Sequence, residues 1–350
     1  MDIYDTICLS GGGIKGFSFI GALDYLQNKS FIDINKITNW VGTSAGSIVS
    51  YLFTLGYTIH EIGDFILDFN FQSLESEISI DGLLESYGLN NGIKIMVLMS
   101  SFLKEKLNIE DINFIDHFKL TNKKLTIIGT NFSKSIEAVF NYETQPNMSV
   151  ITAIRISCSI PIIFEPVLFN GDYYIDGGLI NNFPLNQCKP KTTLGIFIKN
   201  GCCNNLKNIV DLIKGCIQII SDSISLKDYS PDKYKIIQID NFLQEFTNFE
   251  LSREKKLKII KLGQTFAQKF LNDLEKSEPI IEPIIEPIIE QIVEPIVEPI
   301  VEPIVEPIVE PIVEPIVEPI IEPIIEPIIE PIVELIVEPI VEQLIDKIID

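Results

Sequence analysis

A proline at every fourth position in the C-terminal part of the chain is the feature that most constrains the fold. From Glu278 to Glu342 the sequence repeats Glu-Pro-Ile-Ile or Glu-Pro-Ile-Val, with 17 glutamates and 14 prolines. Each proline removes a backbone donor and forbids a continuous α-helix, and it pushes the preceding residue towards extended geometry. We therefore expect a globular domain over residues 1–277 and an acidic low-complexity repeat tail over 278–350, extended or disordered.

The two parts differ in charge. In the tail, 17 glutamates and two aspartates against one lysine give 18 of the chain's 22 net negative charges, which leaves only −4 for residues 1–277. A mildly acidic domain has no basic surface for nucleic acid, so we expect no nucleic-acid partner. The sequence does not identify protein partners of the tail.

Targeting signals and metal-binding patterns are missing from the sequence. Residues 1–5 carry acid where a signal peptide needs base, and no apolar run approaches the roughly 18 residues that span a bilayer. The six cysteines are scattered without a CxxC pair, as in reduced intracellular proteins. Neither His60 nor His117 is spaced with a cysteine pair. We expect a cytoplasmic protein, soluble or peripherally membrane-associated, with no metal and no cofactor.

A strand–glycine–helix order occurs twice near the N-terminus and predicts an α/β fold with parallel strands. Apolar runs predict strands over 3–9 and 37–41, and helical spacing predicts helices over 16–27 and 45–55. Residues 57–122 alternate helical patches with turns, which suits a lid, a substrate channel or ordinary helical packing. Further strands are predicted over 125–131, 136–141, 173–175, 193–198 and 234–239, and further helices over 149–157, 206–226 and 252–276.

The first chemical motif is Gly42-Thr43-Ser44-Ala45-Gly46, which fits G-x-S-x-G. This pattern places a serine on a sharp turn between a strand and a helix, where its hydroxyl projects above the sheet. The helix that follows points its positive end at the site and favours developing negative charge. The pattern alone is weak, because Ser44 could be a helix N-cap only, but its position between an apolar strand and a helix favours a nucleophile.

The second motif is the glycine-rich segment Gly11-Gly12-Gly13-Ile14-Lys15-Gly16, which matches G-x-G-x-x-G through Gly11, Gly13 and Gly16. It does not fit a P-loop, because no Ser or Thr follows the lysine. A dinucleotide site would need an acid at the end of the next strand, which instead ends in Gly42-Thr43-Ser44. Consecutive amides at a helix start suit an oxyanion hole formed by Gly11, Gly12 and Gly13. We expect Lys15 to be a solvated loop lysine.

The third motif supplies a general base. Asp176-Gly177-Gly178 follows the apolar run 173–175, whereas His60 and His117 lie in the irregular region 57–122 and follow no strand. A carboxylate can take the serine proton directly if partial burial raises its pKa. Asp-Gly is also a common turn, but the two motifs described above favour a catalytic Asp176.

Together the three ordered motifs resemble those of the patatin-like phospholipases over roughly residues 3–275. Ser157, Pro161 and Phe164, and the segment Asn181-Asn182-Phe183-Pro184, resemble that family as well. The resemblance implies a three-layer α/β/α fold with a mainly parallel sheet. In domain size and composition the chain looks most like viral or microbial members.

The resemblance also implies an activity. It implies a lipid acyl hydrolase, of phospholipase A type, in which a Ser44–Asp176 dyad cleaves fatty-acyl esters of phospholipids or other glycerolipids at a membrane surface. Arg155 could meet lipid phosphate, although a surface role is the expectation. The alternative is a non-catalytic interaction protein that acts through its acidic repeat tail.

Overall fold

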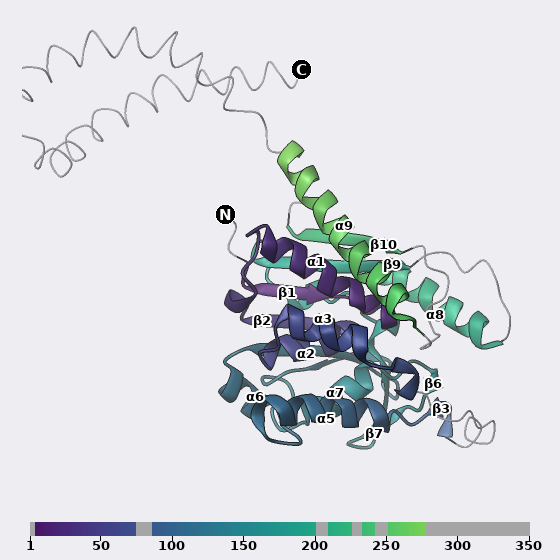
Figure 1. Cartoon of the computed structure of the whole chain (residues 1–350). Coiled ribbons are helices and arrows are strands. Elements are labelled where there is room, and N and C mark those ends of the chain that lie inside the picture. Colours follow the sequence, from purple (N-terminus) through teal and green to yellow (C-terminus); the bar gives the residue numbers. More distant parts are fainter. Residues whose placement is uncertain (1–3, 75–85, 201–208, 226–232, 242–250, 278–350) are drawn as a thin grey trace, which may run out of the picture. The chain divides into compact units, whose positions relative to one another are not determined.

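The computed structural model describes residues 4–74, 86–200, 209–225, 233–241 and 251–277 (Figure 1). The chain divides into two units at Lys276 and Ser277. The repeat tail predicted for 278–350 lies outside the described residues, as do Cys202 and Cys203, so the structure leaves those expectations as predictions.

The described part contains an eight-stranded sheet. Along the sheet the strands follow the order β10-β9-β1-β2-β4-β8-β7, with β5 also paired to β4. The strands β10, β9, β1, β2 and β4 are parallel, whereas β5, β7 and β8 join antiparallel. Their bounds are β1 Thr6–Leu9, β2 Asn39–Thr43, β4 Lys124–Asn131, β5 Ile136–Phe140, β7 Val167–Phe169, β8 Asp172–Asp176, β9 Thr193–Asn200 and β10 Lys235–Asn241, and a separate two-stranded sheet pairs β3 Gly88–Asn90 with β6 Ile162–Phe164.

The central strands are buried on both faces, which is why they read as continuous apolar runs. In β1, Ile7 and Leu9 belong to the large hydrophobic core, whereas Cys8 between them belongs to a smaller core on the other face. In β2, Trp40 and Val41 divide in the same way. The sheet is thus the middle layer of a three-layer fold.

Helices cover this sheet, and Figure 1 shows α1, α2, α3 and α9 lying across one side of it. The helices are α1 Phe17–Asn28, α2 Ala45–Thr54, α3 Ile59–Asp68, α5 Ile93–Leu107, α6 Phe114–Thr121, α7 Val150–Ser157, α8 Ile209–Ser225 and α9 Arg253–Ser277, with 3-10 turns η1 Gly13–Gly16, η2 Ile34–Lys36, η3 Phe71–Leu74, η4 Gly177–Leu179 and η5 Leu185–Gln187. The predicted strands and helices are confirmed to within a few residues wherever they fall on described residues.

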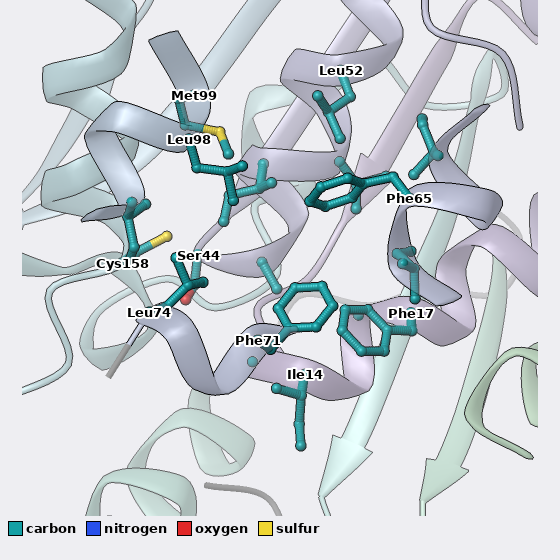
Figure 2. A pocket seen from close by; sticks show the side chains of 18 of the residues that line it. Ile14, Phe17, Ser44, Leu52, Phe65, Phe71, Leu74, Leu98, Met99 and Cys158 are labelled. Atoms are coloured by element: carbon teal, nitrogen blue, oxygen red, sulfur yellow. The ribbon is translucent and has the colours of Figure 1, made fainter. Parts of the chain in front are cut away.

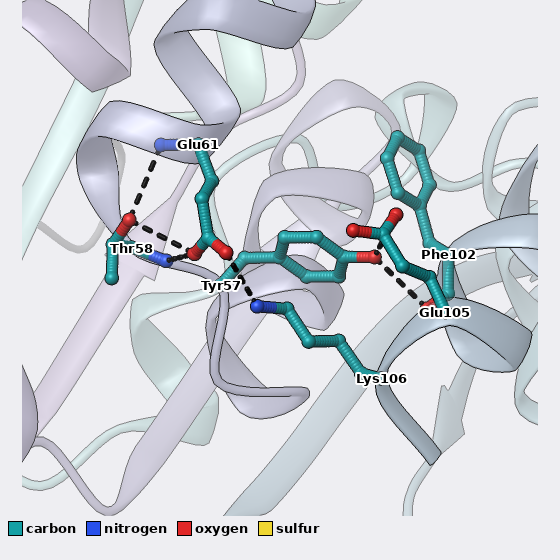
Figure 3. Close-up of polar contacts among 6 residues, drawn as sticks. All are labelled: Tyr57, Thr58, Glu61, Phe102, Glu105 and Lys106. Carbon is teal, nitrogen blue, oxygen red and sulfur yellow. Dashed lines mark hydrogen bonds and ion pairs between the residues drawn. The ribbon is translucent and has the colours of Figure 1, made fainter. Parts of the chain in front are cut away.

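The described residues within 57–122 fold largely into regular helices, and side-chain contacts join the start of α3 to the end of α5 (Figure 3). Thr58 caps α3 in a capping box with Glu61, whose carboxylate also pairs with Lys106 of α5 at 2.6 Å. The Tyr57 hydroxyl donates to the carbonyl of Phe102 at 3.0 Å. These contacts fix the spacing of two helices whose inner faces line the cavity described below.

The pairing of β4 determines where β8 ends. On one edge, β4 pairs with β5 over Ile127–Asn131, so β2 and β8 must share the other edge. There Ile128 pairs with Thr43, and the next residue, Gly129, pairs with Asp176. The sheet therefore brings Asp176 directly beyond the end of β2, beside Ser44, although the two lie far apart in sequence.

Candidate active site

Ser44 occupies a sharp turn between β2 and α2. Its φ of 51° and ψ of −121° form a conformation that residues other than glycine adopt only under strain. Its side chain makes no capping hydrogen bond to the helix. The strained backbone orients the Ser44 hydroxyl away from the helix, and a residue that served only as an N-cap would not require this strain.

Two serines hold this strained turn in place. The Ser44 N–H donates to Ser157 Oγ at 2.8 Å, and the Ser157 hydroxyl donates to the carbonyl of Ile128 at 2.6 Å. On the helix side, the Ser47 hydroxyl donates to the Ser44 carbonyl at 2.6 Å. All of these groups are buried, so a lost partner would leave an unsatisfied polar atom.

Asp176 is 4% exposed, and its environment disfavours a negative charge. Burial raises the pKa of the carboxyl group to about 7, against opposing hydrogen bonds from the Gly178 N–H and the Ser44 hydroxyl. The Gly178 N–H donates to Oδ1 at 2.7 Å. A carboxyl group with this pKa can both accept and return a proton near neutral pH.

The Ser44 hydroxyl approaches the Asp176 carboxyl closely enough to lower its pKa, but the contact is not a well-aligned hydrogen bond. Oδ2 of Asp176 is buried without an aligned donor. Loose geometry of this kind is common in substrate-free sites and tightens when a substrate binds. The structure thus brings together the serine and the aspartate that the motifs single out.

The glycine-rich loop lies against the serine. A Cβ placed on Gly11 would come within 3.4 Å of Ser44 Cβ, and one on Gly16 within 2.9 Å of Ala45 Cβ. Gly12 caps the turn η1, and Gly13, with φ of 55°, begins it. First-turn amides have no partner within their own helix, which leaves these two available for a ligand oxygen.

Gly11 plays a different role from the one expected. Its N–H donates to the carbonyl of Asn182 at 3.0 Å, so this amide is already occupied and does not suit an oxyanion donor. Asn182 also packs against the turn at Gly178. Gly11 therefore ties the glycine-rich loop to the segment that follows Asp176, and the sequence pattern alone could not distinguish an anchoring glycine from its neighbours.

An apolar cavity of about 190 Å³ opens onto Ser44, and Figure 2 shows its lining side chains. It exceeds the roughly 150 Å³ of an engineered cavity that accommodates benzene. The walls come from η1, α1, α2, α3, η3, α5 and β6 and from the segment between α7 and β6, and Ser44 is the lining residue that carries a hydroxyl group. The larger side chains that line it are Phe17, Leu52, Phe65, Phe71, Leu98 and Met99.

Cys158 lies beside Ser44 in the same cavity, a position that no sequence pattern predicts (Figure 2). Burial, followed by the nearby Asp176 charge, raises the pKa of the thiol to about 12. Because the thiolate is the reactive form, Cys158 is a neutral wall residue. It is a free thiol, as are Cys8, Cys188 and Cys216.

Neither histidine reaches this site. His117 is buried in α6, and its Nε2 lies 3.0 Å from the Thr54 hydroxyl at the far end of α2. Burial lowers the pKa of His117 to about 4. Thr54 is ten residues along the chain from Ser44, or roughly 15 Å of helix. His60 is exposed on α3.

The expectation that Lys15 is a solvated loop lysine is wrong. Its side chain is 2% exposed, and burial lowers its pKa to about 7 while the charge of Asp222 on α8 acts in the opposite direction. A sequence pattern shows that a lysine lies among loop glycines, but it does not show that the folded chain buries this lysine.

The expected surface role of Arg155 is also wrong. The guanidinium is 3% exposed and donates to the carbonyls of Asn91 and Glu165 at 3.0 and 2.9 Å, as well as to the Ser159 hydroxyl. The Ser159 carbonyl in turn accepts the N–H of Asp176 at 2.9 Å. Arg155 therefore supports the strand end that carries Asp176, and it is not available to a lipid phosphate.

The described residues contain neither a cluster of metal ligands nor a candidate membrane-spanning helix. Among them, no group of three or more His, Cys, Asp or Glu side chains is arranged to hold a metal ion. Likewise, over the ranges that the structure covers, none of the helices combines the length and apolarity that crossing a membrane demands.

The fold and the site define a class of protein: an α/β protein in which a serine on a strand-to-helix turn lines an apolar cavity, with a glycine-rich loop and a buried aspartate beside it. The family model described as patatin-like phospholipase matches residues 7–189, about half of the chain. The chain belongs to the patatin-like phospholipase family and has its three-layer fold.

Individual relatives agree with this placement. The chain is 37% identical over 188 residues to "Probable lipid hydrolase 463L" of Invertebrate iridescent virus 6, an alignment covering 52% of this chain and 62% of the relative. It is 27% identical to "Intracellular phospholipase A2" of Caenorhabditis elegans over 51% of this chain and 16% of that protein. The chain spans less than two thirds of the length of these relatives. Among solved structures, VipD from Legionella pneumophila aligns over 78% of this chain and 67% of its own, with 18% identity and a TM-score of 0.49.

Proposed function

We propose that this protein is a lipid acyl hydrolase of phospholipase A type, in which Ser44 is the nucleophile and Asp176 the general base. The observation that carries the proposal is that the Asp176 carboxyl lies beside the hydroxyl of Ser44, a residue that lines an apolar cavity. A serine hydroxyl on a strained turn and a carboxyl group whose pKa is raised to about 7 are the two groups that serine ester hydrolysis needs.

The reaction follows from the positions of these groups. Ser44 Oγ attacks the ester carbonyl carbon while Asp176 takes the hydroxyl proton, and the amides of Gly12 and Gly13 stabilise the negative oxygen. Collapse of this intermediate breaks the bond to the alcohol, which Asp176 protonates, and leaves an acyl ester on Ser44. Asp176 then takes a proton from the water that attacks this ester, and returns it to Ser44 Oγ as the bond between Oγ and the acyl carbon breaks, which releases the fatty acid and restores the dyad.

The cavity supports a fatty-acyl substrate. Its lining side chains are almost entirely aliphatic or aromatic, and burying a hydrocarbon chain there yields about 0.8 kcal/mol for each CH₂ group. A head group would find no buried charge in the cavity, because the nearby Arg155 already pairs with backbone carbonyls. The acyl chain therefore enters and the rest of the lipid remains outside.

Active-site labelling tests the assignment of the nucleophile. A fluorophosphonate probe is expected to label the wild-type chain at Ser44 alone, and Ser44→Ala should lose both the label and the release of fatty acid from phosphatidylcholine. The loss of fatty-acid release should be roughly 10⁴-fold or more. Ser101→Ala, which removes an exposed hydroxyl on α5, is the matched control. Labelling of Ser101 or of any other serine, or lipolysis that survives Ser44→Ala, would contradict the proposal.

The pH dependence tests the base. Asp176 must be ionised to accept the proton, so kcat/KM should rise about tenfold per pH unit below its pKa of about 7 and level off above it. Hydrolysis of a soluble short-chain ester between roughly pH 5 and 9 measures this profile. The protein must stay folded over this range. A rate that is flat through pH 6, or that falls as pH rises from 5 to 7, rejects Asp176 as the base.

A further inference from the structure

The first two turns of α5 are apolar on nearly every side. From Ile93 to Met99 the sequence is Ile-Lys-Ile-Met-Val-Leu-Met, in which Lys94 is the one charged residue. A helix of a globular protein normally confines its apolar residues to one face, and a helix that is apolar all round is normally enclosed by apolar material. In this protein, apolar material covers only part of the start of α5.

One face of this helix lines the cavity and the opposite face reaches solvent. Ile95, Leu98, Met99 and Phe102 line the cavity. Ile93 and Val97, one turn apart and therefore on one side of the helix, are 55% and 62% exposed. The wall that would hold the acyl chain is thus also an outward-facing apolar surface.

A tyrosine is also exposed ahead of α5 in the sequence. Tyr87, 65% exposed, immediately precedes β3, which begins at Gly88 and pairs with β6. Ile163 and Phe164 of β6 line the cavity. Tyr87 has φ of 64°, and a large residue held there in left-handed geometry is unusual. We call Ile93 and Val97, which lie on one side of the helix, the α5 surface.

The size and charge of the α5 surface identify its occupant. Two exposed side chains are too few for the roughly 800 Å² that each partner buries in a standard protein interface. Shallow insertion into a lipid surface needs only a few apolar or tyrosine anchors. A bilayer is also the phase that contains the acyl chains for which the cavity is suited, and the cavity lies on the other side of the same helix.

We propose that the α5 surface inserts into the interface of a phospholipid bilayer and so holds the cavity against its substrate. This proposal rests on the proposed lipid hydrolase function. With one lysine in these turns, attraction is mainly apolar, so binding does not require anionic lipid and persists in about 0.5 M salt.

The experiment measures sedimentation with phosphatidylcholine vesicles, using the full chain with Ser44→Ala so that no lipid is consumed. Ile93→Ser combined with Val97→Ser is expected to weaken vesicle binding at least about tenfold. Leu120→Ser is the matched control, because Leu120 has the same 62% exposure as Val97. It lies on α6, which Figure 1 shows at the opposite end of the domain from β3. Thermal melting checks that each variant is folded.

Three results would overturn the proposal: no sedimentation of the parent chain with vesicles, an equal loss in the Leu120→Ser control, or a double variant that changes only self-association in ultracentrifugation. With Ser44 restored, the double variant should also lower the ratio of vesicle hydrolysis to soluble-ester hydrolysis. A chain that binds vesicles through the α5 surface but hydrolyses no ester would refute the proposed activity and leave the docking surface standing.

Discussion

Asp176→Asn is expected to lower ester hydrolysis by about 10³-fold or more while leaving the protein folded. Asparagine preserves the shape of the side chain and can still accept the Gly178 N–H, which Oδ1 accepts at 2.7 Å in the wild type. It cannot take a proton from Ser44, and general-base catalysis contributes roughly 10²–10⁴ in rate. The rate should not recover at high pH, because the amide does not ionise in this range.

The same substitution is expected to change the pH dependence of stability. Because the pKa of Asp176 is raised to about 7 in the folded protein and is close to 4 in an unfolded chain, the folded state binds more protons between these values. The free energy of unfolding of the wild type therefore falls as pH rises from 4 to 7. Above pH 7 the carboxyl group is ionised in both states, so the loss of stability stops growing, at a total of up to about 4 kcal/mol.

Thermal melting of the two proteins between pH 4 and 8 measures the effect. The melting temperature of Asp176→Asn relative to wild type should increase from pH 4 to 7 and then stay level. A cost of the amide that does not depend on pH shifts this difference equally at every pH, so it does not affect the trend. Asp64→Asn, an exposed position on α3, should show no such trend. A difference that shrinks over this range would mean that burial does not raise the pKa of Asp176.

The parts of the site that sequence predicts well are those encoded by local patterns. The apolar runs before Gly11, Gly42 and Asp176 identify three strand ends, because a strand buried on both faces leaves a continuous apolar segment. Glycines directly after these runs mark the turns. The dyad could be proposed without knowing how β4 joins the two strands, since the motifs alone suggest that they meet.

The parts that sequence does not predict depend on packing between distant segments. Lys15 and Arg155 look like surface residues because nothing nearby in sequence covers them, yet both are almost fully buried. Gly11 and its neighbour Gly12 look equivalent, and only the position of the Asn182 carbonyl separates their roles. The cavity is assembled from helices in a region whose patterns fit several arrangements.

Gly46→Ala is expected to destabilise the protein by at least about 3 kcal/mol, the upper end of the usual cost of overpacking. A Cβ at position 46 would lie 2.4 Å from the carbonyl oxygen of Leu9 and 2.6 Å from that of Ser10. Both atoms belong to backbone at the end of β1, which cannot rotate away as a side chain could. The methyl group would push α2 away from the start of the glycine-rich loop, and with it the nucleophile from its oxyanion donors.

Gly63→Ala provides the matched comparison, because it makes the same chemical change within another helix. Gly63 lies inside α3, and a Cβ there would meet only Ile20 Cγ2, at 3.9 Å. Alanine favours a helix by about 1 kcal/mol over glycine, so this variant should be slightly more stable than wild type, with unchanged labelling of Ser44. Urea unfolding of both variants gives the two free energies. Equal effects would mean that α2 and β1 are not in backbone contact, and the glycines of the serine turn would then lack the steric reason argued for them.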